Sequence, residues 1–338
     1  MKRIPSLDGL RAISILLVVV GHLGKSGHAP RIFWSYYAEI GVRIFFVISG
    51  YLITSILLKE HERTSTISLR EFYIRRAFRI FPAALVFLLI IFPIYWRELR
   101  WYDMAAAFFY VANMDPVRPW ILGHLWSLSI EEQFYLLWPS VLKRWYRHRV
   151  AILVGVFALA PVLQAALYAF KVRGGGAGLL PTVGNNLAIG CLLAIFARRI
   201  GKVSPYVALG MTVAVGLIPL FSANTATRTL VMLFVLHPVL YVSIAGIILH
   251  VVQRPYWILN CAPVVWLGKI SYSLYLWQQP FCSDPHLRSG YLTLLALVCA
   301  ALSYYLVEQP MLRMRERRTP DQVKESSRKM LQSPATAA

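Results

Sequence analysis

The segment VAILVGVFALAPVLQAALYAF, Val150 to Phe170, contains no Asp, Glu, Lys, Arg or His. A helix needs roughly 20 mostly apolar residues to cross the hydrocarbon layer of a bilayer, which is about 30 Å thick. This segment therefore predicts a membrane-spanning helix. The whole chain of 338 residues agrees, because 58% of its residues are apolar and only 15% are charged. Water-soluble domains usually contain about 25% charged residues, so we expect an integral membrane protein.

Apolar runs, separated by charged, glycine or proline residues, predict an all-α, polytopic domain over residues 1–312. Lys and Arg between the runs are more frequent on the side of the N-terminus, so we expect both termini to face the cytoplasm. The basic segment 313–338 is expected to be a partly disordered cytoplasmic tail that is not catalytic. Residues 101–114 predict either an interfacial segment or a short loop helix. Ten spans are predicted, near residues 8–24, 40–58, 80–96, 124–142, 150–170, 182–199, 204–221, 228–251, 263–282 and 290–309.

The net charge of +20 is compatible with nucleic-acid binding, but a nucleic-acid binder usually gathers its Lys and Arg on one soluble face. Here these residues lie between apolar segments, which is the distribution that membrane topology produces. We therefore expect no nucleic-acid partner. Four cysteines stand singly in or beside apolar runs, so no metal site or disulfide is expected.

Ionisable residues inside a span cost roughly 2.5–3.5 kcal/mol at the helix centre, so they mark candidate sites. Asp8 and Arg11 are near the inner end of the first predicted span, and His22 is near its outer end. His124 begins the fourth span, which runs inward from the outer face. Two imidazoles from different helices are thus expected to converge on one site, although a lone intramembrane histidine can also simply bond a neighbouring helix.

The fourth span holds a dense polar cluster, GHLWSLSIEEQFY over residues 123–135. A histidine near neutral pKa can act as a general base toward a hydroxyl, and a carboxylate can orient it. Asp8, Glu131 or Glu132 could be that carboxylate. The predicted catalytic residues are His22, Asp8, His124 and Glu131, and the predicted acceptor-binding residues are Trp126, Ser127, Glu132 and Tyr135.

Three arginines, Arg75, Arg76 and Arg79, lead into the third predicted span. The planar guanidinium group binds phosphate well, and Arg11 is expected on the same side. Positive-inside topology alone would explain one or two of them. Together they predict an anion-binding mouth for a phosphate-bearing donor. Ser49, in a small-residue stretch that allows close helix packing or leaves room for a narrow ligand, is predicted to belong to the same donor site.

Taken together, these segments resemble the acyltransferase-3 family of integral membrane acyltransferases over about residues 5–312. In that family an Arg and a His separated by ten residues are regarded as essential, which implies roles for Arg11 and His22. The family's arginines before the third span match the three named above. The matching stretches are Ser6 to Arg11 with His22, Gly41 to Leu52, Phe72 to Pro82, His124 to Pro139, Leu187 to Gly190, Ser271 to Trp277, and Tyr305 to Pro310.

The resemblance implies about ten spans in the inner membrane, an acyl-CoA donor that is often acetyl-CoA, and a carbohydrate or glycoside acceptor. It implies an O-acyltransferase without a metal cofactor, and it leaves the oligomeric state open. Three positions depart from the family pattern: Arg43 replaces an acidic residue, Asn185 an Asp and Gln278 a His. These departures bear on the acceptor side of the site.

The resulting hypothesis places the phosphates of acyl-CoA among the arginines and the thioester near His22, which deprotonates an acceptor hydroxyl entering from outside. Direct transfer is favoured over a covalent relay through Ser49 or a histidine. The alternative is a transporter or flippase of a lipid-linked or glycosidic substrate, because transporters also keep ionisable residues near the midplane. A third alternative, a membrane sensor or scaffold, does not explain the cluster of His and Glu residues.

Overall fold

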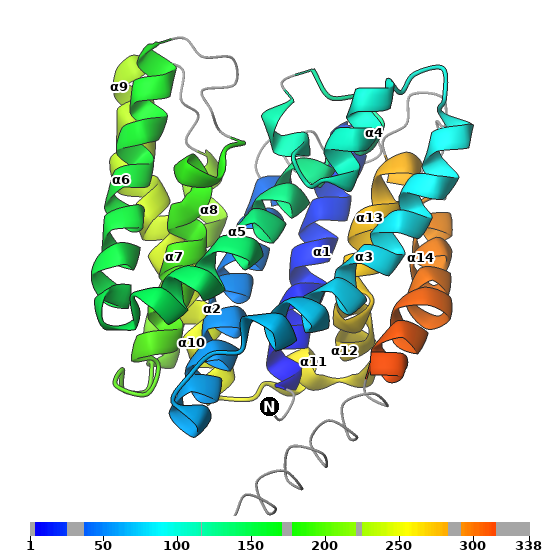
Figure 1. Cartoon of the computed structure of the whole chain (residues 1–338). Coiled ribbons are helices and arrows are strands. Elements are labelled where there is room, and N and C mark those ends of the chain that lie inside the picture. Colours follow the sequence, from blue (N-terminus) through cyan, green and yellow to red (C-terminus); the bar gives the residue numbers. More distant parts are fainter. Residues whose placement is uncertain are drawn as a thin grey trace, which may run out of the picture.

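The computed structural model describes residues 4–25, 37–115, 117–170, 178–220, 225–282 and 292–315. This part of the chain is all-helical and contains no strand, as the sequence predicts (Figure 1). The main helices are α1 (Pro5–Lys25), α2 (Ala38–Thr64), α3 (Leu69–Ile94), α5 (Leu125–Arg144), α6 (Arg149–Ala169), α7 (Leu180–Phe196), α8 (Pro205–Leu217), α10 (His237–Gln253), α13 (Ser271–Cys282) and α14 (Leu292–Ser303). The shorter ones include α4 (Trp101–Phe108), α9 (Ala226–Val231), α11 (Trp257–Asn260) and α12 (Ala262–Lys269).

Helices overlap all ten predicted ranges, but those that could cross a bilayer by length and composition number six within the described residues. They are α1, α2, α3, α6, the continuous run from α9 through α10, and the run from α14 to Arg315. Two shorter apolar helices, α7 and α8, accompany them. The chain therefore has the helices of a multi-pass membrane protein.

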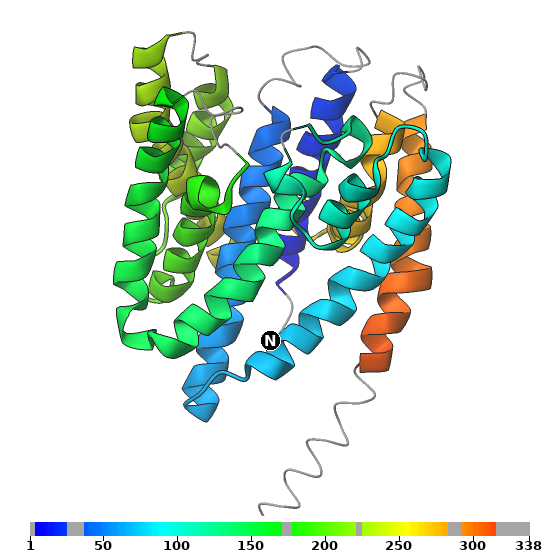
Figure 2. The same ribbon diagram turned by 45° about the horizontal axis from the view of Figure 1, so that its top comes forward.

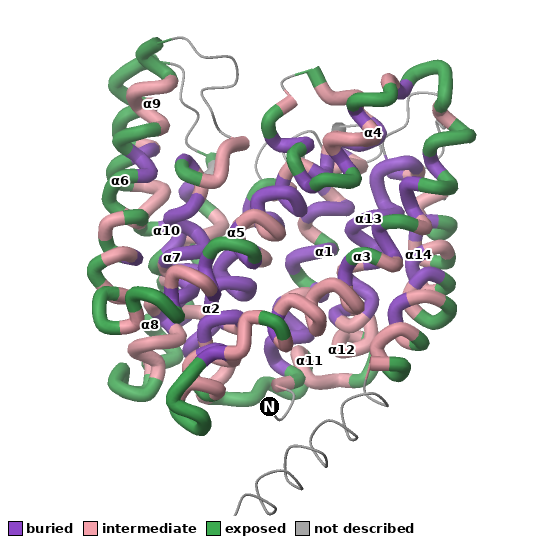
Figure 3. Tube along the Cα trace, in the orientation of Figure 1, coloured by how far each residue is buried: buried purple, intermediate pink, exposed green. Residues whose placement is uncertain are grey.

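The outer helices turn apolar side chains away from the protein. The apolar window of α6 has a mean hydropathy of 2.4, yet only 17% of it is buried. Leu89 on α3, Leu159 on α6 and Leu294 on α14 are all exposed, and Figure 3 shows buried residues concentrated toward the middle of the bundle. A belt of this kind is stable in lipid, where no water contacts the apolar side chains.

Several predicted boundaries differ from the structure. The predicted span 263–282 is divided at Ile270 into α12 and α13. Helix α3 begins at Leu69, eleven residues before the predicted start, because Ser68 caps it by accepting from the backbone N–H of Glu71 at 3.4 Å. Residues 101–114 contain the short helix α4, in agreement with one of the two predicted alternatives. The final helix continues to Arg315, past the predicted domain boundary at residue 312; residues 316–338 lie outside the described part.

Helix α1 runs through the middle of the bundle, with α2 on one side and α12 and α13 on the other (Figures 1 and 2). Small residues bring the backbones close together. A Cβ atom added to Gly41 of α2 would lie 2.4 Å from the carbonyl oxygen of Ser14, and one added to Gly268 of α12 would lie 1.9 Å from that of Asp8. The backbone of α1 is thus in close contact with α2 on one side and with α12 on the other, which fixes its position along the bundle axis.

Helices α2 and α7 meet through two glycines. A Cβ atom on Gly50 would lie 2.2 Å from the carbonyl oxygen of Leu187, and one on Gly190 would lie 2.2 Å from that of Val47. The contacts are reciprocal, so each glycine makes room for the backbone of the other helix. The resemblance of the Gly41–Leu52 and Leu187–Gly190 stretches to a family pattern therefore has a packing reason at these two positions.

We expect Gly190→Ala to destabilise the folded protein by about 1–3 kcal/mol, because overpacking forces the two backbones apart. Thermal unfolding in detergent, followed by the fraction that stays monodisperse in size-exclusion chromatography, measures this. The matched control is Gly155→Ala on α6, where an added Cβ atom meets nothing within 4 Å. Equal losses in the two variants would contradict the close contact of α2 and α7.

Candidate active site

A cavity of about 640 Å³ lies at the end of α1 remote from the N-terminus, and we name it the histidine cavity. Helices α1, α2, α5 and α13 and the segment before α5 contribute to it. It contains both histidines that the sequence predicts to converge. Its lining residues are Val18, His22, Ala38, Glu39, Val42, Arg118, Trp120, Gly123, His124, Trp126, Tyr275 and Gln279.

His22 is held by an amide rather than a carboxylate. Its Nδ1 atom lies 2.6 Å from Oε1 of Gln278, a buried residue of α13. Because a carbonyl oxygen only accepts, Nδ1 carries the proton and the neutral ring has an unprotonated Nε2. The indole of Trp120 packs edge-on against the imidazole at 5.7 Å. The position where the family pattern has a histidine therefore sets the tautomer of His22.

His124 is buried immediately before α5, and its ring is packed edge-on against Phe87 and Tyr275 at 5.6 Å each. Neither of its ring nitrogens makes a hydrogen bond of good geometry in the described part of the chain, and the nearest polar groups are the backbone of Leu276 and the side chain of Gln279. Buried polar atoms without a partner are rare, and in a cavity they point to water or a ligand as the partner. The structure thus brings His22 and His124 to the same cavity.

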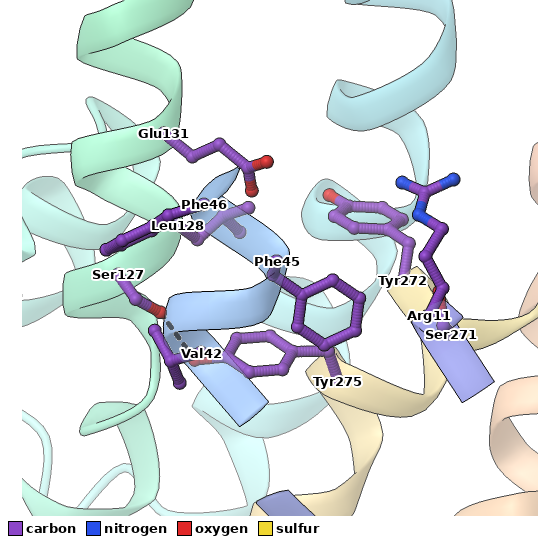
Figure 4. Close-up of a pocket in the computed structure, with 10 residues that line it drawn as sticks. All are labelled: Arg11, Val42, Phe45, Phe46, Ser127, Leu128, Glu131, Ser271, Tyr272 and Tyr275. Atoms are coloured by element: carbon purple, nitrogen blue, oxygen red, sulfur yellow. Dashed lines mark hydrogen bonds between the residues drawn. The ribbon is translucent and has the colours of Figure 1, made fainter. Parts of the chain in front are cut away.

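A second cavity of about 50 Å³, the narrow cavity, adjoins the first, since Val42 and Tyr275 line both. Figure 4 shows residues from α1, α2, α5 and α13 surrounding it. The hydroxyls of Ser127 and Tyr275 lie 2.5 Å apart within it. Aromatic rings form much of the wall. The lining residues are Arg11, Val42, Phe45, Phe46, Ser127, Leu128, Glu131, Ser271, Tyr272 and Tyr275.

Glu131 projects toward the narrow cavity from α5 (Figure 4). Its carboxylate accepts hydrogen bonds from the hydroxyls of Ser49 and Tyr135, and the Tyr135 hydroxyl lies 3.0 Å from Ser49 Oγ. Two hydroxyl donors keep the charged carboxylate solvated inside the bundle. Glu131 therefore links α2 to α5 through hydrogen bonds with these hydroxyls. It is not the hydrogen-bond partner of the Nδ1 atom of His22.

A third cavity of about 220 Å³, the arginine cavity, adjoins the narrow cavity through Arg11. The three predicted arginines lie within the first turns of α3 and face it. Arg75 is paired with Glu60 at 3.3 Å, and the guanidinium of Arg76 lies 4.4 Å from the ring centroid of Tyr135. The lining residues are Arg11, Ser49, Leu52, Ile56, Phe72, Arg75, Arg76, Arg79, Tyr135 and Arg315.

Among the described residues, the lining of the arginine cavity includes five arginines and no acidic residue. Arg11, Arg76 and Arg79 form no close ion pair with a described residue, although Glu131 attracts Arg11 and Glu132 attracts Arg76 from a greater distance, and Nε of Arg11 is buried without a hydrogen-bond partner. Burying cations together is unfavourable unless an anion joins them. The arrangement suits a ligand with several negative charges, as phosphate groups have.

Three predicted residues, Asp8, Glu132 and Tyr135, do not line the histidine cavity. Asp8 and His22 lie on the one continuous helix α1, and their fourteen-residue separation is about 21 Å along its axis. The idea that Asp8 orients His22 is therefore wrong. Glu132 is turned by about 100° from Glu131 around α5, and its Oε1 atom is buried without a partner in the described part of the chain. Tyr135, predicted to bind the acceptor, lines the arginine cavity instead.

Other lining residues are absent from the sequence prediction. The histidine cavity is also lined by Glu39, Arg118, Trp120 and Gln279. Arg315, which the sequence places in a non-catalytic tail, lines the arginine cavity. The signal for Arg118 and Trp120 was their place directly before the polar cluster of α5. Glu39 resembles an ordinary residue at a helix start, so its sequence position gives no such signal.

Two departures from the family pattern have local explanations. Arg43 donates to Glu39, one turn earlier on α2, at 2.6 Å and to the hydroxyl of Tyr241 at 2.8 Å. The cation is thus neutralised within its own helix. Asn185 is buried, and its side-chain oxygen accepts from the backbone N–H of Asn186 at 3.0 Å. A potential metal site of three or more His, Cys, Asp or Glu residues does not occur among the residues described.

Curated proteins similar to this chain are named as O-acetyltransferases. Peptidoglycan O-acetyltransferase OatA of Listeria monocytogenes is 31% identical over 366 aligned residues, covering 91% of this chain and 56% of its own. A putative O-acetyltransferase of Staphylococcus aureus is 32% identical, with coverages of 92% and 57%. Putative peptidoglycan O-acetyltransferase YrhL of Bacillus subtilis is 30% identical, with coverages of 91% and 55%. The chain thus spans about half the length of these relatives.

No solved structure matches this chain. The sequence model of the acyltransferase-3 family, whose description is "Acyltransferase domain", matches residues 4–307. That range includes Arg11, His22, the arginines of α3 and the polar cluster of α5. All three cavities are lined almost entirely by residues within it. Because the match extends over nearly the whole chain, this protein belongs to the acyltransferase-3 family.

Proposed function

We propose that the chain is an inner-membrane O-acetyltransferase that transfers acetyl from cytoplasmic acetyl-CoA to a hydroxyl of a carbohydrate on the outer side. One observation carries the proposal: a cavity lined by five arginines and a cavity that contains two histidines each share lining residues with the narrow cavity. The named relatives support an acetyl group and a glycan acceptor. The N-terminal end of the bundle is then the cytoplasmic end.

The donor enters at the arginine cavity. The phosphates of acetyl-CoA bind Arg11, Arg76 and Arg79, which have no ion-pair partner among the residues described. Its slender pantetheine arm continues past Phe45 and Tyr272 through the narrow cavity. Arg11 and His22 are eleven residues apart, about 16 Å along α1, so the thioester at the end of this arm reaches the neighbourhood of His22.

The acceptor occupies the histidine cavity, where Trp120 and Trp126 offer indole rings to the faces of a sugar. His22 Nε2 takes the proton of the acceptor hydroxyl as its oxygen bonds to the thioester carbonyl carbon. The carbon–sulfur bond then breaks, and the departing thiolate receives the proton from His22. The hydroxyls of Ser127 and Tyr275, which in this structure contact each other and the backbone carbonyl of His124, turn to donate to the intermediate oxyanion.

The test uses inside-out membrane vesicles that contain the protein, loaded with glycan fragments and supplied with radiolabelled acetyl-CoA outside. We expect alkali-labile acetyl ester on the enclosed glycan, dependent on the protein. The transporter alternative predicts passage of unmodified glycan across the membrane without acetyl-CoA. Label confined to the outer compartment would contradict transfer across the bilayer, and an absence of labelled glycan on either side would contradict the acetyltransferase proposal.

Gln278 is expected to act as a positioning residue for His22. Replacing it with leucine removes the acceptor at 2.6 Å from Nδ1, so the imidazole loses its fixed tautomer. We expect Gln278→Leu to lower kcat about tenfold and to leave the KM for acetyl-CoA unchanged. Gln278→Glu should restore most of kcat, because a carboxylate also accepts from Nδ1–H. A leucine variant with unchanged kcat would show that this hydrogen bond has no role in transfer.

A further inference from the structure

Among the described residues that line the histidine cavity is an arginine without an ion-pair partner. This residue is Arg118, and its Nη1 atom donates to the backbone carbonyl of Asp115 at 2.9 Å. The carboxylate of Asp115 is used elsewhere, because it accepts from Arg100 at 3.4 Å and from the backbone N–H of Val117 at 2.9 Å. Arg118 itself forms no ion pair with any described residue.

The other ionisable groups of the cavity do not supply the missing anion. The Glu39 carboxylate is paired with Arg43 at 2.6 Å, on the same helix. His22 and His124 contribute no negative charge in either protonation state. Partial burial lowers the pKa of Arg118 while Asp115 opposes this, but a guanidinium remains ionised at neutral pH. The cavity therefore has a net positive charge on the side of Arg118.

The geometry points to an acceptor that carries an anionic group, a carboxylate or a phosphate, which Arg118 binds while a hydroxyl of the same molecule reaches His22. This inference rests on the proposed function and narrows its acceptor class. The planar guanidinium has several donors left after its contact with Asp115, enough for a two-point contact with an anionic oxygen pair. Trp120, two residues further along the chain, lines the same cavity and packs against the His22 ring, so a ligand in this cavity is surrounded by all three side chains.

The experiment compares three hexosamine glycosides that differ in one substituent: a carboxyalkyl ether, its neutral carboxamide, and a phosphate ester. Equilibrium binding to the detergent-purified protein is measured first, since binding does not depend on turnover. We expect the wild type to bind one of the anionic glycosides about 10- to 100-fold more tightly than the carboxamide, the scale of a hydrogen bond to a charged group. The preferred anion distinguishes a carboxylated glycan from a phosphate-bearing one.

Arg118→Gln is expected to remove this preference, lowering affinity for the anionic glycoside to that of the carboxamide. The control is Arg149→Gln at the start of α6, because Arg149 likewise donates from Nη1 to a carbonyl three residues earlier, that of Tyr146, at 2.6 Å. It should keep the wild-type preference. Equal binding of all three glycosides by the wild type, or a preference that survives in Arg118→Gln, would overturn the inference.

Acetyl transfer to the same glycosides separates this inference from the proposed function. Transfer without any charge preference would overturn the role of Arg118 and leave the acetyltransferase intact. A charge preference in binding with no acetyl transfer to any glycoside would support Arg118 and count against the proposed function. The KM for acetyl-CoA should be the same in the wild type and Arg118→Gln, because the arginine cavity is untouched.

Discussion

Replacing His22 with glutamine is expected to lower acetyl transfer by about 10²- to 10⁴-fold, the usual contribution of a general base. Glutamine is similar in size and polarity, but its amide cannot take a proton from a hydroxyl at neutral pH. The place of His22 in the histidine cavity, with Nδ1 fixed by Gln278, makes Nε2 the expected base. Initial rates of ester formation per amount of folded protein measure the effect.

The control is His250→Gln, which alters another buried histidine of the bundle. Both ring nitrogens of His250 are occupied, one by the carbonyl of Val203 at 2.9 Å and one by the hydroxyl of Tyr256 at 2.6 Å. It stands in the last turn of α10, so its replacement tests the general cost of losing a buried imidazole. We expect His250→Gln to reduce the yield of folded protein but not the rate per folded molecule. A His22→Gln variant that kept the wild-type rate would remove His22 as the base.

Arg79→Gln and Arg76→Gln are each expected to raise the KM for acetyl-CoA about 10- to 100-fold, because each removes one of the charge-assisted contacts that we propose with phosphate. The kcat should change little, since the histidine cavity is untouched. Steady-state kinetics with varied acetyl-CoA and saturating acceptor give both constants. The effect should shrink at high salt, because phosphate binding at an open mouth is screened.

Arg70→Gln provides the comparison on the same helix. Arg70 is on the exposed face of α3, with 75% of its side chain accessible and Glu71 at 3.8 Å. Its loss should leave the KM unchanged. Acetyl-dephospho-CoA, which lacks the 3′-phosphate, refines the assignment: if Arg79 binds that phosphate, the two losses will not add. Unchanged KM in both Arg76→Gln and Arg79→Gln would place the phosphates elsewhere.

The sequence predicted the all-helical fold and much of the candidate site for one physical reason. Ionisable side chains are costly in a membrane, so Arg11, His22, His124 and the arginines of α3 stood out from their apolar surroundings. The rise per residue of an α-helix then predicted how deep in the membrane each of these residues lies. The structure gathers His22 with His124, and Arg11 with the three arginines, as this reasoning expected.

The partners of these residues could not be read in the same way. Gln278 lies 256 residues from His22 in sequence, and only the packing of α13 against α1 brings them together. Ser49 and Glu131 are similarly joined by the packing of α2 against α5. The sequence position of an amide or hydroxyl in an apolar run does not indicate its hydrogen-bond partner, because several helices contain groups that could form the bond. Hydropathy also missed the break at Ile270, since α12 and α13 are both rich in apolar and aromatic residues.

Helix α1, whose backbone is in close contact with α2 and α12, places Arg11 at the arginine cavity and His22 at the histidine cavity. A separation of eleven residues is about three full turns of an α-helix, so the two side chains lie on one face. The number of residues between Arg11 and His22 therefore sets both the distance between the two side chains and the face of the helix on which they lie. Inserting one residue between them would rotate His22 by about 100° out of register, whereas inserting seven would return it to the same face about 10 Å too far away. The length of this stretch is therefore as constrained as its composition.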